Sequence, residues 1–199
     1  METVGIERSE TREWTVADLE RLPEDGTRYE LVAGRLEVSP APVSLHTLIE
    51  SRLTIHLGAN APDEHMVLTG PRINLNAAGT HHRIPDVAVI RAEDFERPYL
   101  RQPPLLVIEV VSPESVFRDH HTKAREYAEF GIPSYWIVNP VLDKPSIVEL
   151  RLHRGTYREA AQVFDTDVFA TKEPFPIRVV PHWLVNRGPW REHIGGTQS

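Results

Sequence analysis

The sequence predicts one domain of the α/β (α+β) class, in which helices flank a mixed central β-sheet. Two short, β-branched runs, 84–90 and 105–111, have the composition of neighbouring buried strands. An amphipathic helix is expected over about 118–130 and a further strand over 134–138, so helix and strand patterns alternate. The chain has 199 residues, of which 40% are hydrophobic, and this suits one core better than two.

Five further elements are expected before the central runs. They are a helix, a hairpin, a second helix and two short strands, at 16–22, 28–39, 44–57, 66–68 and 72–75. Ala33-Gly34 suits a two-residue hairpin turn, and Ser44 can cap the second helix, which should stop at Gly58. Residues 76–83, which include His81 and His82, are interpreted as a polar loop.

After the central runs, Gly131 ends the predicted helix, and Arg154-Gly155 provides the turn of a second hairpin over 147–163. A short strand or helix is expected around 175–185. The resulting single domain covers residues 14–185, with polar tails at 1–13 and 186–199.

Composition narrows the functional classes. The chain has no cysteine, which excludes disulfides, thiolate zinc sites and a cysteine nucleophile. No apolar run approaches the roughly 18 residues of a membrane span, so we expect a cytoplasmic protein without membrane contact. The formal charge of −7 argues against general affinity for polyanions. Contact with nucleic acid would need a local basic patch or metal ions.

Glu109 is the one charged residue in the run 105–111, whose other residues are apolar on both alternating faces. This pattern is typical of a central strand that is covered on both sides. An isolated buried carboxylate is costly unless a cation, a metal ion or several donors compensate it. The sequence therefore predicts a partner beside Glu109.

Asp86 stands near the start of the run 84–90. If the two runs pair, Asp86 and Glu109 can face the same cleft and bind a hard cation such as Mg²⁺, which prefers oxygen ligands. Lys123, on the helix that follows, could be the cation that Glu109 requires and could orient an attacking water. Tyr127 lies on the same helical face as Lys123 and is expected to pack against the sheet.

Each of these residues also has a purely structural interpretation. Glu109 can belong to a buried ion pair, and Asp86 can begin a strand or make a turn hydrogen bond. Lys123 can form an exposed helical pair with Asp119, four residues earlier. His46, on the flank of an apolar helix, is more typical of a packed or surface residue than of a ligand.

Several motifs in combination resemble the Uma family of restriction-endonuclease-like proteins, in the PD-(D/E)XK nuclease superfamily. The resemblance spans roughly residues 14–185. It rests on Pro85-Asp86, Ile108-Glu109-Val110-Val111-Ser112-Pro113, Lys123-x-x-x-Tyr127, Gly131-Ile132-Pro133-Ser134-Tyr135-Trp136-Ile137-Val138, Tyr29-Glu30-Leu31-Val32-Ala33-Gly34-Arg35-Leu36, Pro40-Ala41-Pro42 and His46.

The resemblance implies a restriction-endonuclease-like core with added N-terminal and C-terminal β-hairpins. It implies that Asp86, Glu109 and the carbonyl of Val110 bind Mg²⁺, with Mn²⁺ as a substitute. The superfamily's usual lysine would stand at Val111, so the resemblance points to Lys123 on the next helix instead. By analogy, Glu30 is an additional acidic residue at the border of the site, and Glu37 competes for that role.

The expected function is that of a Mg²⁺-dependent endonuclease that hydrolyses DNA by metal-activated water, with a homodimer suited to cutting both strands. Two other functions stay open. The acidic charge and Val111 also suit a non-catalytic binding or regulatory module that retains the nuclease fold. A metal-dependent enzyme that acts on a smaller phosphoester is the third possibility, and RNA is an alternative to DNA as the polymer.

Overall fold

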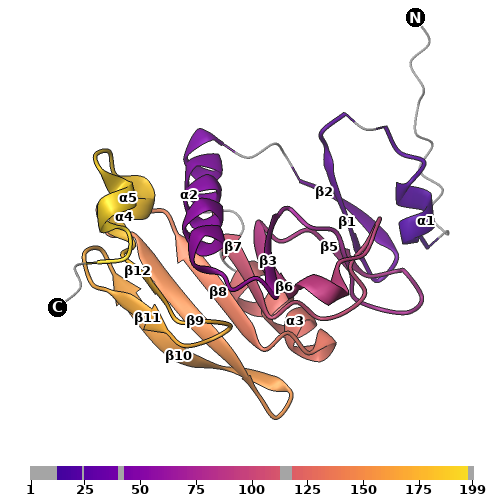
Figure 1. Cartoon of the computed structure of the whole chain (residues 1–199). Helices are drawn as coiled ribbons and strands as arrows, with labels where there is room; N and C mark the ends of the chain where they lie inside the picture. Colours follow the sequence, from indigo (N-terminus) through magenta and orange to yellow (C-terminus); the bar gives the residue numbers. More distant parts are fainter. Residues whose placement is uncertain (1–12, 24, 40–42, 113–117, 197–199) are drawn as a thin grey trace, which may run out of the picture.

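The computed structural model describes residues 13–23, 25–39, 43–112 and 118–196. In this part of the chain, a six-stranded sheet has the order β10-β9-β8-β7-β6-β3 (Figure 1). Its strands are β3 (His65–Thr69), β6 (Val87–Arg91), β7 (Leu106–Val110), β8 (Ser134–Asn139), β9 (Ser146–His153) and β10 (Thr156–Phe164). Strands β7 and β8 are parallel, while the other neighbours are antiparallel, which confirms the mixed sheet.

A second sheet, of order β2-β1-β5-β4, stands beside the first. It consists of β1 (Arg28–Val32), β2 (Arg35–Ser39), β4 (Ile73–Asn74) and β5 (His82–Arg83). Ala33 and Gly34, at the β1–β2 turn, have φ values of 48° and 73°, as a two-residue hairpin turn of this kind requires. A Cβ atom at Gly34 would lie 2.8 Å from Cβ of Glu13, so glycine also meets a steric demand there.

The expected loop 76–83 is wrong at its end. His82 and Arg83 form β5, and both are fully buried. A polar dipeptide does not resemble a buried strand. The burial of Arg83 is tolerable because carboxylates from distant parts of the chain pair with it, and the ring of His82 contacts the carbonyl of Ile73. Residues 1–12 of the expected N-terminal tail lie outside the described residues.

Two helices matter for the site. Helix α2 (Ser44–Asn60) begins where expected, but its N-cap residue is Val43 and it continues past Gly58. Helix α3 (Ala124–Phe130) is preceded by one π-helical stretch, η2 (Arg118–Lys123), and ends at Gly131 with φ 92° as expected. The smaller helices are α1 (Val16–Leu19), η1 (Ala92–Asp94), α4 (His182–Val185) and α5 (Trp190–His193).

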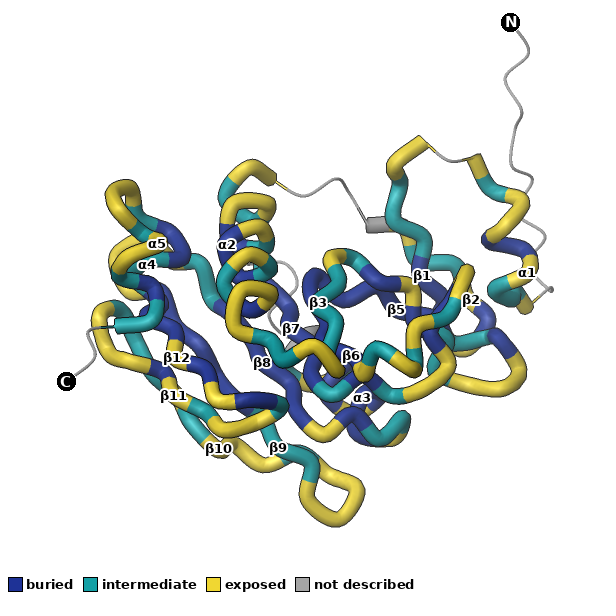
Figure 2. Tube along the Cα trace, viewed as in Figure 1, coloured by how far each residue is buried: buried dark blue, intermediate teal, exposed yellow. Residues whose placement is uncertain are grey.

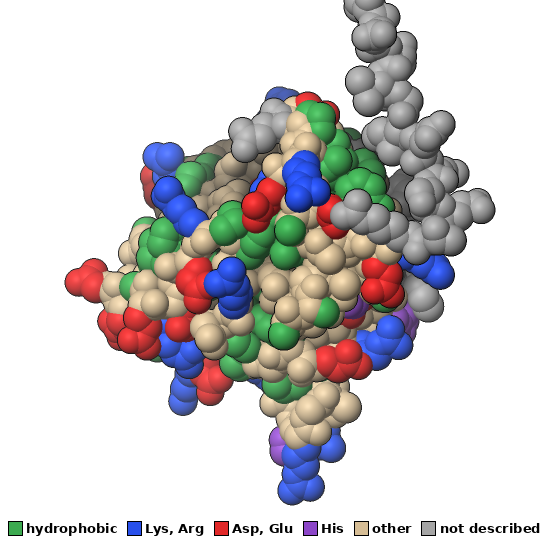
Figure 3. Space-filling view, turned by 90° about the vertical axis from the view of Figure 1, so that its right-hand side faces the viewer, with side chains coloured by type: hydrophobic (Ala, Val, Ile, Leu, Met, Phe, Trp, Pro, Cys, Tyr) green, Lys and Arg blue, Asp and Glu red, His purple; other side chains and the backbone are tan. Residues whose placement is uncertain are grey.

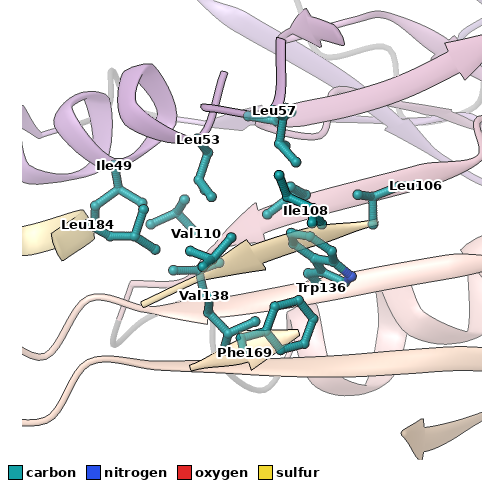
Figure 4. Packing of buried hydrophobic residues seen from close by; sticks show 14 of the residues in the cluster. Ile49, Leu53, Leu57, Leu106, Ile108, Val110, Trp136, Val138, Phe169 and Leu184 are labelled. Carbon is teal, nitrogen blue, oxygen red and sulfur yellow. The ribbon is translucent and has the colours of Figure 1, made fainter. Parts of the chain in front are cut away.

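The two helices cover opposite faces of the six-stranded sheet. Ile49, Leu53 and Leu57 of α2 pack on Ile108 and Val110 of β7 (Figure 4). On the other face, Ala124 and Tyr127 belong to a second cluster with Ala88, Val107 and Tyr135. The central strands are buried along most of their length (Figure 2), so β7 is the central strand that its composition predicts.

Part of the expected C-terminal tail, residues 186–199, packs on the core. Ile194 is buried in the core beneath α2, and Trp190 packs against the same core. The guanidinium of Arg52 lies 5.1 Å from the centre of the Trp190 ring. Before this segment, β11 (Phe169–Thr171) and β12 (Ile177–Val179) form a separate two-stranded sheet. None of the helices in the described ranges is long and apolar enough to cross a bilayer.

Candidate functional site

Asp86 and Glu109 lie opposite each other at the end of the β6–β7 pairing in the central sheet. The register pairs Val87 with Ile108, so Asp86, immediately before β6, faces Glu109 on β7. The Val110 N–H donates a hydrogen bond of 2.8 Å to Asp86 Oδ2. Both carboxylates are almost fully buried, with 2% and 3% exposure. The predicted pairing of the two strands is confirmed, and the cost of burying two acids has to be met locally.

Glu109 has two partners from the helix that covers it. Lys123 Nζ lies 2.8 Å from Glu109 Oε2, and the Tyr127 hydroxyl donates a hydrogen bond of 2.7 Å to Oε1. Burial, followed by the nearby charge of Glu109, raises the pKa of Tyr127 well above its ordinary value. Tyr127 therefore stays protonated and acts as a donor. The cation expected beside Glu109 is Lys123.

Asp86 contacts two basic side chains that the motif does not indicate. Arg28 donates from one terminal nitrogen to Asp86 Oδ1 at 2.9 Å and from the other to the carbonyl of Ile84. His46 Nε2 lies 3.0 Å from Asp86 Oδ2, although its ring is not aligned for a regular hydrogen bond.

These contacts decide the ionisation of Asp86. Burial opposes the charged form, but the contact with His46 and the charge of Arg28 prevail, and the pKa of Asp86 lies below its ordinary value. Burial alone would lower the pKa of His46, yet Asp86 raises it above the ordinary value. The sequence indicates His46 only as a packed or surface residue, and it gives no signal for Arg28, which lies 58 positions from Asp86 in the chain.

A second charge cluster surrounds Arg83, whose side chain is fully buried. Its guanidinium contacts Glu126 of α3 twice, at 2.7 and 3.0 Å. The third nitrogen lies 3.1 Å from Glu30 Oε2 and 3.0 Å from Glu37 Oε2. His81 Nε2 lies 3.2 Å from Glu126 Oε1. The Arg83 cluster therefore connects the N-terminal hairpin to the helix that carries Tyr127.

Glu30 and Glu37, the two competing candidates for an additional acid, share the same guanidinium. Glu30 also accepts a hydrogen bond of 2.9 Å from the N–H of Ile84, two residues before Asp86. Burial would raise the pKa of Glu30, but the charges of Lys123 and Arg83 lower it. Glu30 is therefore electrostatically linked to Lys123, which contacts Glu109.

Glu126 is a functional candidate that no sequence motif indicates. Burial opposes its ionisation, but hydrogen bonds from His81 and Arg83 lower its pKa to about 2. The signal that could have found it is the spacing on the helix, because Glu126 lies one turn after Lys123 and directly before Tyr127. His81, interpreted above as a loop residue, belongs to this cluster.

The donor chemistry at Asp86 and Glu109 fits a hard divalent cation with few protein ligands. Both residues present carboxylate oxygens, and a main-chain carbonyl such as that of Val110 is the same kind of ligand. In the parts of the chain that the structure describes, no group of three histidine or acidic side chains is arranged to hold a metal. Mg²⁺ tolerates such a sparse set because it retains several waters.

The comparisons with known proteins identify the family and the fold of the chain. The family model of Uma2, described as "Putative restriction endonuclease", matches residues 16–182. The chain belongs to the Uma2 family. The Uma2 match covers the hairpin β1–β2, both carboxylates and α3, so every residue of the candidate site lies inside the shared region.

A solved structure shows the same fold. It is the crystal structure of "a putative nuclease belonging to DUF820" from Anabaena variabilis, with a TM-score of 0.62 and 16% sequence identity. The similarity covers 79% of this chain and 88% of that one. The restriction-endonuclease-like fold expected from the motifs is therefore confirmed. No curated protein matches the sequence significantly.

Proposed function

We propose that this Uma2 protein is a Mg²⁺-dependent endonuclease that hydrolyses phosphodiester bonds of DNA. The observation that carries the proposal is the opposition of Asp86 and Glu109 across two paired strands, with Lys123 2.8 Å from Glu109. Membership of a family described as restriction endonucleases and the fold shared with a nuclease support it. Buried acids with fixed cationic partners are typical of functional sites.

Asp86, Glu109 and the carbonyl of Val110 would hold the ion, with Mn²⁺ as a substitute. When bound, Mg²⁺ would neutralise charge on the phosphate and lower the pKa of a coordinated water. Asp86 is held ionised by His46 first, and then by Arg28 and the N–H of Val110, so it is ready to bind a cation without first losing a proton.

Lys123 has two tasks in this proposal. Its ammonium balances Glu109 in the resting protein, and it would orient the attacking water and stabilise negative charge that develops on the phosphate. Tyr127 fixes the rotamer of Glu109 from the other carboxylate oxygen. Lys123, at the end of η2, would thus perform what the superfamily's strand lysine would perform from position 111, where this chain has valine. The charge of Lys123 also lowers the pKa of Glu30.

The test is cleavage of linear duplex, single-stranded DNA and RNA with Mg²⁺, with Mn²⁺ and with EDTA. Glu109→Gln, Asp86→Asn and Lys123→Met should each lower the rate by about 10²-fold or more. Glu149→Gln is a matched control, because Glu149 is a buried, ion-paired glutamate on β9, two strands from β7. Cleavage that survives EDTA, or survives the first three substitutions, would contradict the proposal.

A second candidate is a binding or regulatory module without catalysis. The observation that favours it is that the oxygens of both carboxylates already have protein partners: Val110, Arg28 and His46 at Asp86, and Lys123 and Tyr127 at Glu109. Mn²⁺ titration separates the two functions, since binding no stronger than that of Asp86→Asn would favour the module. A panel of small phosphoesters would test the third possibility. The homodimer and the cytoplasmic location stay predictions, testable by sedimentation and by fractionation.

A further inference from the structure

A cavity of about 710 Å³ opens next to Asp86 on the side of the N-terminal hairpin. Three lining residues connect the cavity to Asp86 and to the main chain just before it. Arg28 and Ile84 line the cavity, and Arg28 also binds Asp86 and the carbonyl of Ile84. Gly70, another lining residue, donates its N–H to the carbonyl oxygen of Asp86 at 2.9 Å. A ligand in the cavity would therefore adjoin whatever the carboxylate pair binds.

The walls of the cavity combine apolar surface with charges of both signs. The apolar and aromatic lining residues are Leu19, Leu22, Pro23, Tyr29, Ile84 and Pro98. The charged lining residues are two acids, Glu20 and Glu50, and two arginines, Arg28 and Arg72. Figure 3 shows the same mixture on the outer face of this part of the molecule, where acidic, basic and hydrophobic side chains are interspersed.

This lining argues against a phosphate as the occupant. The two acids balance the two arginines, and Arg28 already donates to Asp86 and to a carbonyl. A polyanion is favoured by an excess of positive charge, which the lining lacks. Burial and the charge of Asp86 raise the pKa of Glu50. The carboxyl of Glu50 is therefore partly shielded from water and feels the charge of Asp86. The lining instead suits a neutral, flat ligand with hydrogen-bonding edges.

We propose that the cavity receives the base of the nucleotide that adjoins the phosphate at Asp86 and Glu109. The apolar side chains and Tyr29 offer surface for the base, Glu20 and Glu50 can accept from its amino or imino groups, and Arg72 can donate to its carbonyl or ring nitrogens. The volume lies within the range of small-molecule sites. This inference rests on the proposed nuclease function, which supplies the phosphate.

The consequence is a preference for unpaired substrate. In a duplex each base is stacked and paired, so it would have to be extruded before it could enter the cavity, and extrusion is unfavourable. A nucleotide in a single strand, or beside a mismatch, enters without that cost. The substrate class assigned by the cavity is therefore single-stranded or locally unpaired nucleic acid.

The test is calorimetric binding of the four 2′-deoxynucleoside 5′-monophosphates, compared with 2-deoxyribose 5-phosphate, to the full chain without divalent metal. At least one nucleotide should bind about tenfold more tightly than the sugar phosphate, because only the base enters the cavity. Leu22→Trp, at a half-buried wall position, should remove the difference. Leu48→Trp, on the exposed side of α2 and outside the lining, should preserve it.

Equal binding of nucleotides and sugar phosphate, no binding of either, or an unchanged preference in Leu22→Trp would overturn the inference. Comparison of the wild-type affinities needs no variant, so a misfolded Leu22→Trp would not leave the question open. The two proposals fail separately. DNA cleavage without base-dependent binding retains the nuclease and removes the base site, and base-dependent binding without cleavage does the reverse.

Discussion

Both faces of the central sheet carry an apolar cluster, but the face beneath α3 also buries charged residues. Beneath α2, the side chains of Leu53, Ile108 and Val110 meet in an apolar cluster (Figure 4). Beneath α3, the next position of the same strand is Glu109, which meets Lys123 and Tyr127. Adjacent residues of β7 therefore differ. Burial of Ile108 and Val110 stabilises the fold, whereas burial of Glu109 has to be compensated by polar partners.

This difference between the two faces indicates where the functional site lies. Burial of apolar surface is favourable without any specific partner, whereas a buried ion pair often contributes little net stability compared with apolar residues of similar size. The face beneath α3 nevertheless places several charged residues out of water, including Asp86, Glu109, Lys123 and Arg83. An arrangement that adds little to stability is best explained by chemistry.

The largest effect on stability is expected from removing Arg83. Arg83→Met leaves Glu126, Glu30 and Glu37 without their shared cation, which should lower the free energy of unfolding by about 3–5 kcal/mol. Arg91→Met is the matched control, because Arg91 is about half exposed and its pair with Asp94 is 3.5 Å long. Denaturant titration measures both. A loss below about 1 kcal/mol for Arg83→Met would show that the charged face is not interdependent.

A core substitution on the other face should cost slightly less and act differently. Leu53→Ala removes a fully buried side chain and should lower the free energy of unfolding by about 2–5 kcal/mol. Cleavage per folded molecule should stay close to that of the wild type, because Leu53 contacts only the apolar cluster. Leu48→Ala, at a 37% exposed position of the same helix, should change neither quantity appreciably. Loss of cleavage in folded Leu53→Ala would erase the contrast between the faces.

The third effect depends on pH. Burial lowers the pKa of His82 from its ordinary 6.5 to about 4, so the folded protein keeps His82 neutral while the unfolded chain takes up a proton. Stability from this group is complete above pH 6.5 and is lost as the pH falls toward 4, with an upper bound of about 3 kcal/mol. His82→Gln should flatten the stability profile in that window, and His153→Gln, an exposed control, should not. Parallel profiles for His82→Gln and the wild type would refute the assignment.

The smallest effect on stability is expected where the chemistry is proposed. Glu109→Gln together with Lys123→Met removes both charges of the buried pair, while the glutamine carbonyl can still accept from Tyr127. The free energy of unfolding should change by less than about 1 kcal/mol or should rise. Glu109→Gln alone leaves Lys123 without this carboxylate and should be less stable than the double variant. A double variant that is the less stable of the two would show that the pair serves the fold.

Local patterns predict the parts of this structure that local physics determines. The two short β-branched runs predict β6 and β7 as neighbouring strands, and Ala33-Gly34 gives the correct hairpin turn. The need of Glu109 for a partner identifies Lys123, because Lys123 lies on η2, the next described helical element after the strand. These inferences depend on neighbours in the sequence or on a single adjacent element.

The missed parts depend on distant residues. Arg28 is 58 positions from Asp86, and Arg83 is 43 positions from Glu126, so no window of sequence shows either pair. The same applies to Ile194, which enters the core through the folding of the whole C-terminal segment. Lone charged or apolar residues have no periodic signal, and only the assembled fold gives them partners.

The most direct test of the central claim is Mg²⁺-dependent DNA cleavage by folded Glu109→Gln/Lys123→Met. If the charges beneath α3 are retained for chemistry, this variant should be as stable as the wild type and should cleave at least about 10²-fold more slowly. Cleavage at the wild-type rate by the folded double variant would contradict the claim.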